Sequence, residues 1–131
     1  MNKKRVNDGI EPAKEAMTLF HIAKDGKITK TFRGQVSTFG AAVTMGSLKS
    51  AVALCADKGA STVERTELLK AMYYVIQKGE NNEYQFNESN FEPTNIFEYI
   101  CRNDNNQTKE KFTDASLSVK LAMSFFDLVS E

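Results

Sequence analysis

Residues 30–59 carry two consecutive amphipathic helical patterns around a Gly-Ser break, and this arrangement constrains the fold more than any other part of the chain. In the first pattern apolar residues recur at spacings of four, three and four, which is one stripe of an α-helix; they are Phe32, Val36, Phe39 and Val43. After Gly46-Ser47 the pattern repeats in Leu48, Ala51, Val52 and Cys55. Because both stripes need burial, we expect two short helices that pack into one core, with Ser47 as the N-cap of the second.

Helical patterns cover most of the remaining chain. Both prolines stand where helices begin, and no Asn-Gly or Asp-Gly turn joins alternating apolar stretches, so a hairpin signal is missing. The patterns predict further helices over about 9–24, from a capping box at 61–64 to about 78, from Pro93 onwards, and from 114 to about 130. We therefore predict an all-α protein, a compact bundle of five to six helices.

The last of these helices is apolar over a wide arc. Its main stripe consists of Leu117, Leu121, Phe125 and Leu128. A helix of this kind usually lies at the centre of a bundle, so we expect these side chains to be among the most buried. We expect a polar loop over 103–111 before it, with Thr113 as its cap.

The chain has 131 residues, of which 41% are hydrophobic, and this suits one core. We predict a single helical domain over 1–131, with a flexible N-terminus over 1–8 and a polar, asparagine-rich loop over 80–92. Three rings in that loop either pack back on the bundle or contact a neighbour; they are Tyr84, Phe86 and Phe91. No run of 18 apolar residues occurs and no apolar region follows the basic start, so we expect a cytoplasmic protein with two buried free thiols, Cys55 and Cys101.

The net charge of zero is a cancellation between two unlike halves. Residues 1–60 hold ten Lys/Arg and five Asp/Glu, whereas residues 61–131 hold seven Lys/Arg and twelve Asp/Glu. A dipolar chain of this kind offers a basic surface to a polyanion and an acidic surface to a protein. Solvated helix faces can also differ by this much by chance.

The sequence contains no recognisable catalytic constellation. It has one histidine, His21, far in sequence from both cysteines, which disfavours a zinc site. It contains neither a GxGxxG nor a GxxxxGK[ST] loop, and its acids show no paired spacing for acid–base chemistry. We therefore expect no enzyme activity and no cofactor.

The cations of the first half are the candidate binding residues. Four of them recur every three residues and two follow further along; the set is Lys24, Lys27, Lys30, Arg33, Lys49 and Lys58. Backbone phosphates require only cations at a suitable pitch, without base reading. A solvated basic face without any partner explains the spacing equally well.

The central segment resembles the small helical subunit of type III-B CRISPR effector complexes, the Cmr complexes. The resemblance rests on the aromatic-basic pair Phe32-Arg33, the turn Ser47-Leu48, and an apolar helix that ends in Lys58-Gly59. The Ala/Met-rich first helix and the terminal segment ASLSVKLAMSFFDLV are also similar to the ends of that family. The chain departs from the family at Ser47, which replaces the turn glycine, and at Gly40, where a proline is frequent.

The resemblance implies a non-catalytic subunit for antiviral defence. Such subunits stack on one another as a minor filament, bind other subunits of the effector complex, and line the channel of guide and target RNA with a basic face. Three alternatives remain open: the small subunit of a type III-A (Csm) complex, a helical protein–protein adaptor without nucleic acid, and a helix-turn-helix regulator. The last is disfavoured because residues 48–57 offer few base-reading side chains.

Overall fold

Six α-helices form the described part of the chain, which confirms the all-α prediction. The computed structural model describes residues 1–56 and 65–130. The helices are α1 (Lys3–Leu19), α2 (Lys30–Met45), α3 (Leu48–Ala56), α4 (Arg65–Glu80), α5 (Pro93–Arg102) and α6 (Asn106–Ala122). Two 3₁₀ turns, η1 (Glu88–Phe91) and η2 (Met123–Phe125), and two strands, β1 (Lys27–Thr29) and β2 (Asp127–Val129), complete the fold.

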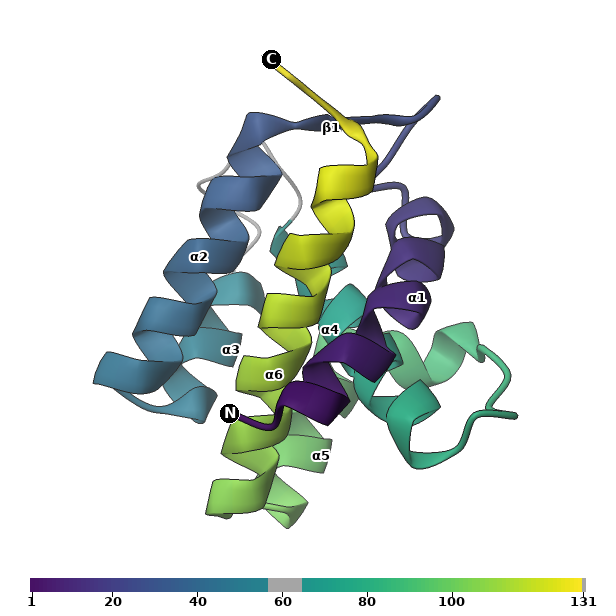
Figure 1. Ribbon diagram of the computed structural model, residues 1–131. Helices are drawn as coiled ribbons and strands as arrows, with labels where there is room; N and C mark the ends of the chain where they lie inside the picture. Colours follow the sequence, from purple (N-terminus) through teal and green to yellow (C-terminus); the bar gives the residue numbers. More distant parts are fainter. Residues whose placement is uncertain (57–64, 131) are drawn as a thin grey trace.

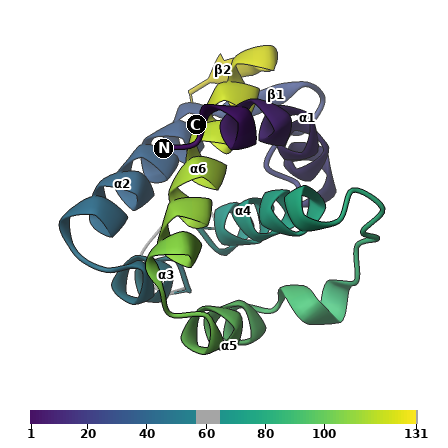
Figure 2. The ribbon, with the colours of Figure 1, turned by 60° about the horizontal axis from the view of Figure 1, so that its bottom comes forward.

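Helix α6 lies at the centre of the bundle. It packs against α1, α2 and α4, and α3 and α5 extend the bundle on the side of α4 (Figure 1). Seen from below, α5 and the loop that precedes it occupy the end of the molecule opposite β1 and β2 (Figure 2). The small sheet and the polar loop therefore lie at different ends of the bundle.

The two stripes that the sequence places between residues 30 and 56 are buried. Helix α2 spans Lys30–Met45 as predicted, and each of its stripe residues exposes 9% or less of its surface. Ser47 caps α3, because its Oγ accepts a hydrogen bond of 3.1 Å from the backbone N–H of Ser50. The capping box expected at 61–64 lies outside the described residues.

The prediction for the first helix is wrong at both ends. Helix α1 begins at Lys3, so residues expected to be a flexible N-terminus are helical. Asn2 caps the helix with a side-chain oxygen 3.0 Å from the backbone nitrogen of Arg5, a cap that sequence reading missed. Pro12, expected in the first turn, lies inside the helix, which ends at Leu19 instead of Lys24.

The predicted burial of α6 is wrong, because another face of this helix is buried. Leu121 is 45% exposed and Phe125 is 63% exposed, while Leu117 and Leu128 are only partly buried. The buried face contains Phe112, Ala115, Ser118, Val119 and Ala122. Successive residues of a helix are about 100° apart, so Leu117 and Leu121 point away from Val119.

Close packing of α1 on α6 explains this choice of face. A Cβ atom added at Gly9 of α1 would lie 2.5 Å from Oγ of Ser118, so the two backbones approach where both residues are small. The Ser118 hydroxyl donates a hydrogen bond of 2.8 Å to the carbonyl of Val6. Leucines on the opposite face are too large for this contact and remain outside.

Both ends of the last helix also differ from the prediction. Helix α6 begins at Asn106, inside the expected loop, and its cap is Asn105, whose side-chain oxygen lies 2.9 Å from the backbone nitrogen of Thr108. It ends at Ala122, where the chain turns through η2 into β2. Strand β2 pairs in parallel with β1, with Ile28 opposite Leu128. This small sheet was not predicted from the sequence.

In the segment expected as a polar loop over 80–92, Glu80 ends α4 and Glu88–Phe91 form η1, and its aromatic rings pack back on the bundle. Phe91 is 1% exposed, and its ring centroid lies 5.1 Å from that of Tyr73 and 5.0 Å from that of Phe86. Cys55 is buried as expected, whereas Cys101 is exposed, which contradicts the prediction. Across the described ranges, every helix is too short or too polar to span a bilayer.

Candidate nucleic-acid interface

A tight turn after α1 presents Lys24 and Lys27 as a pair. The backbone N–H of each donates to the carbonyl of the other, at 2.9 and 3.0 Å. The two residues between them, Asp25 and Gly26, have φ angles of 55° and 76°, as a type I′ turn requires. Residues paired across such a turn project their side chains to the same face. The two exposed ammonium groups therefore lie near each other at the edge of the molecule.

Lys30 and Arg33 extend this basic surface along the first turns of α2. Residues three apart are neighbours on a helix surface, and both side chains are exposed. Helix α2 has no acidic residue in its first turn and no side-chain cap hydrogen bond, so the positive end of its dipole is not compensated locally. Residues 26–56 contain no Asp or Glu at all. The start of α2 is thus strongly electropositive.

These four cations are not neutralised within the described part of the chain. None of Lys24, Lys27, Lys30 and Arg33 forms an ion pair with a described residue. Asp25 lies inside the turn, and the parallel pairing places Asp127 next to Lys27, without an ion pair between the two. A polyanion would therefore meet free cations here.

Lys49 does not join this surface. It lies in the first turn of α3, beyond the far end of the 16-residue helix α2, which is about 24 Å long. Its ammonium nitrogen lies 3.1 Å from a carboxylate oxygen of Asp104, and this hydrogen-bonded contact raises the pKa of Lys49. Lys58 lies outside the described residues. The structure thus brings together four of the six candidate residues and sets Lys49 apart.

The structure adds two cations to Arg33 that sequence reasoning missed. Lys3 from α1 and Lys120 from α6 line one cavity of about 490 Å³ with Arg33. Apolar side chains cover much of its wall, and we call this cavity the basic groove; its apolar residues include Met1, Leu117 and Leu121. No acidic side chain is among the described residues that line it. Because its cations are far apart in sequence, no local pattern could have revealed it.

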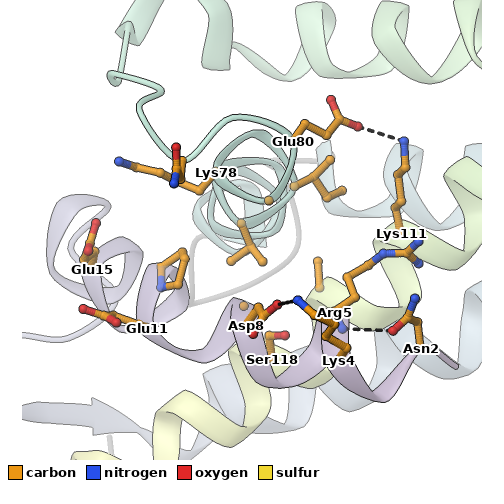
Figure 3. A pocket seen from close by; sticks show the side chains of 17 residues that line it. Asn2, Lys4, Arg5, Asp8, Glu11, Glu15, Lys78, Glu80, Lys111 and Ser118 are labelled. Atoms are coloured by element: carbon orange, nitrogen blue, oxygen red, sulfur yellow. Dashed lines mark hydrogen bonds and ion pairs between the residues drawn. The ribbon is translucent and has the colours of Figure 1, made fainter.

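A second cavity, of about 650 Å³, lies between α1 and α4 and has a different character (Figure 3). Four cationic and four acidic side chains line it, so it has no dominant sign. Several of these charges neutralise each other: Lys4 lies 2.7 Å from Asp8, and Lys111 lies 2.8 Å from Glu80. The Lys4–Asp8 pair lies within α1, the Lys111–Glu80 pair joins α6 to α4, and this mixed lining does not favour a polyanion.

The described residues offer little for catalysis. Burial raises the pKa of the Cys55 thiol to about 11, which keeps it protonated at neutral pH and makes it a poor nucleophile. His21 is exposed and has a φ of 60°. Within residues 1–56 and 65–130, no three His, Cys, Asp or Glu side chains are placed to hold a metal ion.

No family model, curated protein or solved structure matches this chain. What bears on function is therefore the basic surface and the sequence resemblance alone.

Proposed function

We propose that this chain is a non-catalytic structural subunit of a type III-B RNA-guided effector complex, in which its basic edge lies along the RNA. The observation that carries the RNA part is the run of four exposed, unneutralised cations from Lys24 to Arg33 in the described part of the chain. They extend from a tight turn into the electropositive start of α2, where phosphates would be bound without base reading. The assignment to type III-B rests on the resemblance of residues 30–59.

The exposed surface of α3 favours this proposal over a helix-turn-helix regulator. The apolar stripe of α3 is buried, and the described exposed side chains on the other face are Lys49, Ser50, Ala53 and Leu54. Lys49 is paired with Asp104, the Ser50 hydroxyl accepts a hydrogen bond of 2.9 Å from the Ser47 hydroxyl, and the other two have no hydrogen-bonding group in their side chains. A recognition helix needs several side chains that can donate or accept hydrogen bonds at base edges.

The decisive experiment combines purification of the assembled complex with a salt titration of RNA binding. A tagged copy of this chain, purified from its host at its normal level, should bring with it guide RNA and the large subunits of a type III-B complex. Subunits of a type III-A complex would instead support the first alternative. Recovery of proteins without any RNA would support an adaptor and would overturn the RNA proposal.

The RNA-binding role of the basic edge is tested with Lys24→Glu/Lys27→Glu/Lys30→Glu in the complex. Removing one lysine–phosphate interaction should reduce the slope of log affinity against log salt by about 0.7, the value for single strands, so the slope should fall by about 2. Lys4→Glu/Lys109→Glu, which also changes exposed or half-exposed lysines on the same bundle, should leave it unchanged. An unchanged slope in the triple variant would mean that these residues form a solvated face that does not contact RNA.

A further inference from the structure

The basic groove is shaped for a ligand that is both acidic and apolar. None of Lys3, Arg33 and Lys120 forms an ion pair with a described residue. Beside these cations lie Leu121, 45% exposed, and Met1, 71% exposed. No aromatic ring lines the groove within the described residues, so stacking of nucleic-acid bases is not offered. A protein segment fits this chemistry better than an RNA strand does.

The same molecule carries such a segment in the loop between α4 and α5. Residues 79–101 contain five glutamates and no lysine or arginine. Glu83, Glu88 and Glu92 are exposed, and none of them is ion-paired within the described part of the chain. Phe86 lies among them and is 37% exposed, although its ring makes T-shaped contacts with Phe20 and Phe91. The loop therefore presents carboxylates around a partly exposed ring.

The two surfaces belong to different elements and carry opposite charge, because the groove is lined by residues of α1, α2 and α6 and the acidic segment is the loop before α5. The acidic loop and α5 lie at the end away from β1 and β2 in both views (Figures 1 and 2). Because the net charge is zero, two copies do not repel each other as wholes, while unlike ends attract. A contact between two different surfaces of identical chains is heterologous and continues from copy to copy.

We propose that the basic groove receives the acidic loop, residues 83–92, of a second copy of this chain. The carboxylates of Glu83 and Glu88 then face Lys3 and Lys120, and the exposed part of the Phe86 ring covers Leu121. The inference deepens the proposed function and rests on it for its biological setting, since it assigns the two surfaces through which copies would join. The contact itself requires no RNA.

The test measures self-association of the purified full chain by sedimentation velocity. We expect the weight-average sedimentation coefficient to rise with protein concentration at about 10 mM salt, where the Debye length is about 30 Å, and the rise to vanish at about 1 M, where it is about 3 Å. Lys3→Glu/Lys120→Glu and Glu83→Lys/Glu88→Lys should each weaken association more than about tenfold, because like charges then meet. Lys4→Glu/Lys109→Glu is the matched control for the first variant and should associate like the wild type.

Mixing the two groove and loop variants provides the sharpest readout. The groove made acidic in one variant is complementary in charge only to the loop made basic in the other variant. An equimolar mixture of the two should therefore associate again. The methyl signals of Leu117 and Leu121 should shift in that mixture, which a diffuse attraction between net charges would not cause. A wild type that stays monomeric at every concentration at low salt, or a mixture without these shifts, would overturn the inference.

The same variants separate this inference from the proposed function. Loss of RNA binding in Lys3→Glu/Lys120→Glu with unchanged self-association would make the groove a nucleic-acid surface and refute the contact between copies. Normal RNA binding by Lys24→Glu/Lys27→Glu/Lys30→Glu, together with groove-dependent self-association, would refute the RNA proposal and leave the contact standing. Circular dichroism of each variant verifies that it is folded.

Discussion

The guanidinium of Arg5 lies 2.9 Å from the carboxylate of Asp114, which joins the first turns of α1 to the middle of α6. The Asp114 side chain is fully buried, and the same oxygen accepts a hydrogen bond from the backbone N–H of Asn2 at 3.2 Å. The other oxygen has no hydrogen-bond partner among the described residues. Arg5 is therefore the main compensation for a buried negative charge, and it comes from the segment that the sequence indicated to be flexible.

This ion pair predicts an asymmetric response to mutation. Arg5→Ala leaves the buried carboxylate uncompensated and should lower the free energy of unfolding by about 3–5 kcal/mol. Asp114→Asn removes the buried charge, and Arg5, whose side chain is 38% exposed, can turn to solvent and Glu110, so the loss should be smaller. Urea unfolding of both variants measures the difference. Equal losses would mean that the carboxylate is not the costly partner.

The approach of α1 to α6 predicts opposite effects of alanine at two glycines. Gly9→Ala should destabilise the protein by about 1–3 kcal/mol, because its Cβ would meet Ser118 at 2.5 Å and Val75 at 3.0 Å. Gly34→Ala on α2 is the control, since a Cβ there would meet no described neighbour within 4 Å. It should stabilise by about 0.5–1 kcal/mol through helix propensity. Thermal melts would contradict this packing if the two substitutions shifted Tm in the same direction.

The exposed face of α6 predicts that two phenylalanines of the terminal segment differ sharply. Phe112 is 0% exposed, so Phe112→Ala should cost about 3–5 kcal/mol of unfolding free energy. Phe125 is 63% exposed and its ring lies 4.7 Å from the ammonium of Lys14, so Phe125→Ala should cost less than about 1 kcal/mol. Denaturant unfolding of both variants tests the assignment of the buried face. A large loss of unfolding free energy for Phe125→Ala would mean that the stripe predicted from the sequence is the buried face after all.

The raised pKa of Tyr74 predicts that the protein loses stability at high pH. Burial, followed by the 2.9 Å hydrogen bond that its hydroxyl donates to Glu15, raises the pKa of Tyr74 to about 12. The folded chain thus holds this proton more tightly than the unfolded chain, whose tyrosine pKa is about 10. The contribution is complete below about pH 10 and is lost as the pH rises from about 10 to 12.

Comparison with Tyr74→Phe isolates this effect from the lysines that titrate in the same range. Between about pH 10 and 12, the unfolding free energy of the wild type should fall more than that of the variant. Tyrosinate absorbance of the folded protein should also lose its highest-pH step in the variant. A difference that stays constant between about pH 9 and 12 would show that Tyr74 titrates normally.

Helix α2 was predictable because its pattern contains only one possible buried face. Phe32, Val36, Phe39 and Val43 follow one stripe, and apart from the exposed Met45 at the helix end the other residues are small, polar or cationic. Local spacing decides burial where only one side of a helix is apolar.

Helix α6 was not predictable in this way, because apolar residues occupy both of its sides. The small residues Ala115, Ser118 and Ala122 allow α1 to approach, and that contact selects one side over the larger leucines on the other. Which helix comes close is a property of the whole bundle, and spacing within α6 contains no information about it.

By itself, the sequence determined the helical class, the two central stripes and the run of cations from Lys24 to Arg33, since each depends on residues near one another in the chain. Only the tertiary structure decided that Lys3 and Lys120 join Arg33 in one groove and that Lys49 is paired with Asp104 elsewhere. The parallel pairing of β1 with β2 belongs to the same category. Contacts between residues that are this far apart in the sequence depend on how helices pack, and packing is selected by side-chain volume across the whole core.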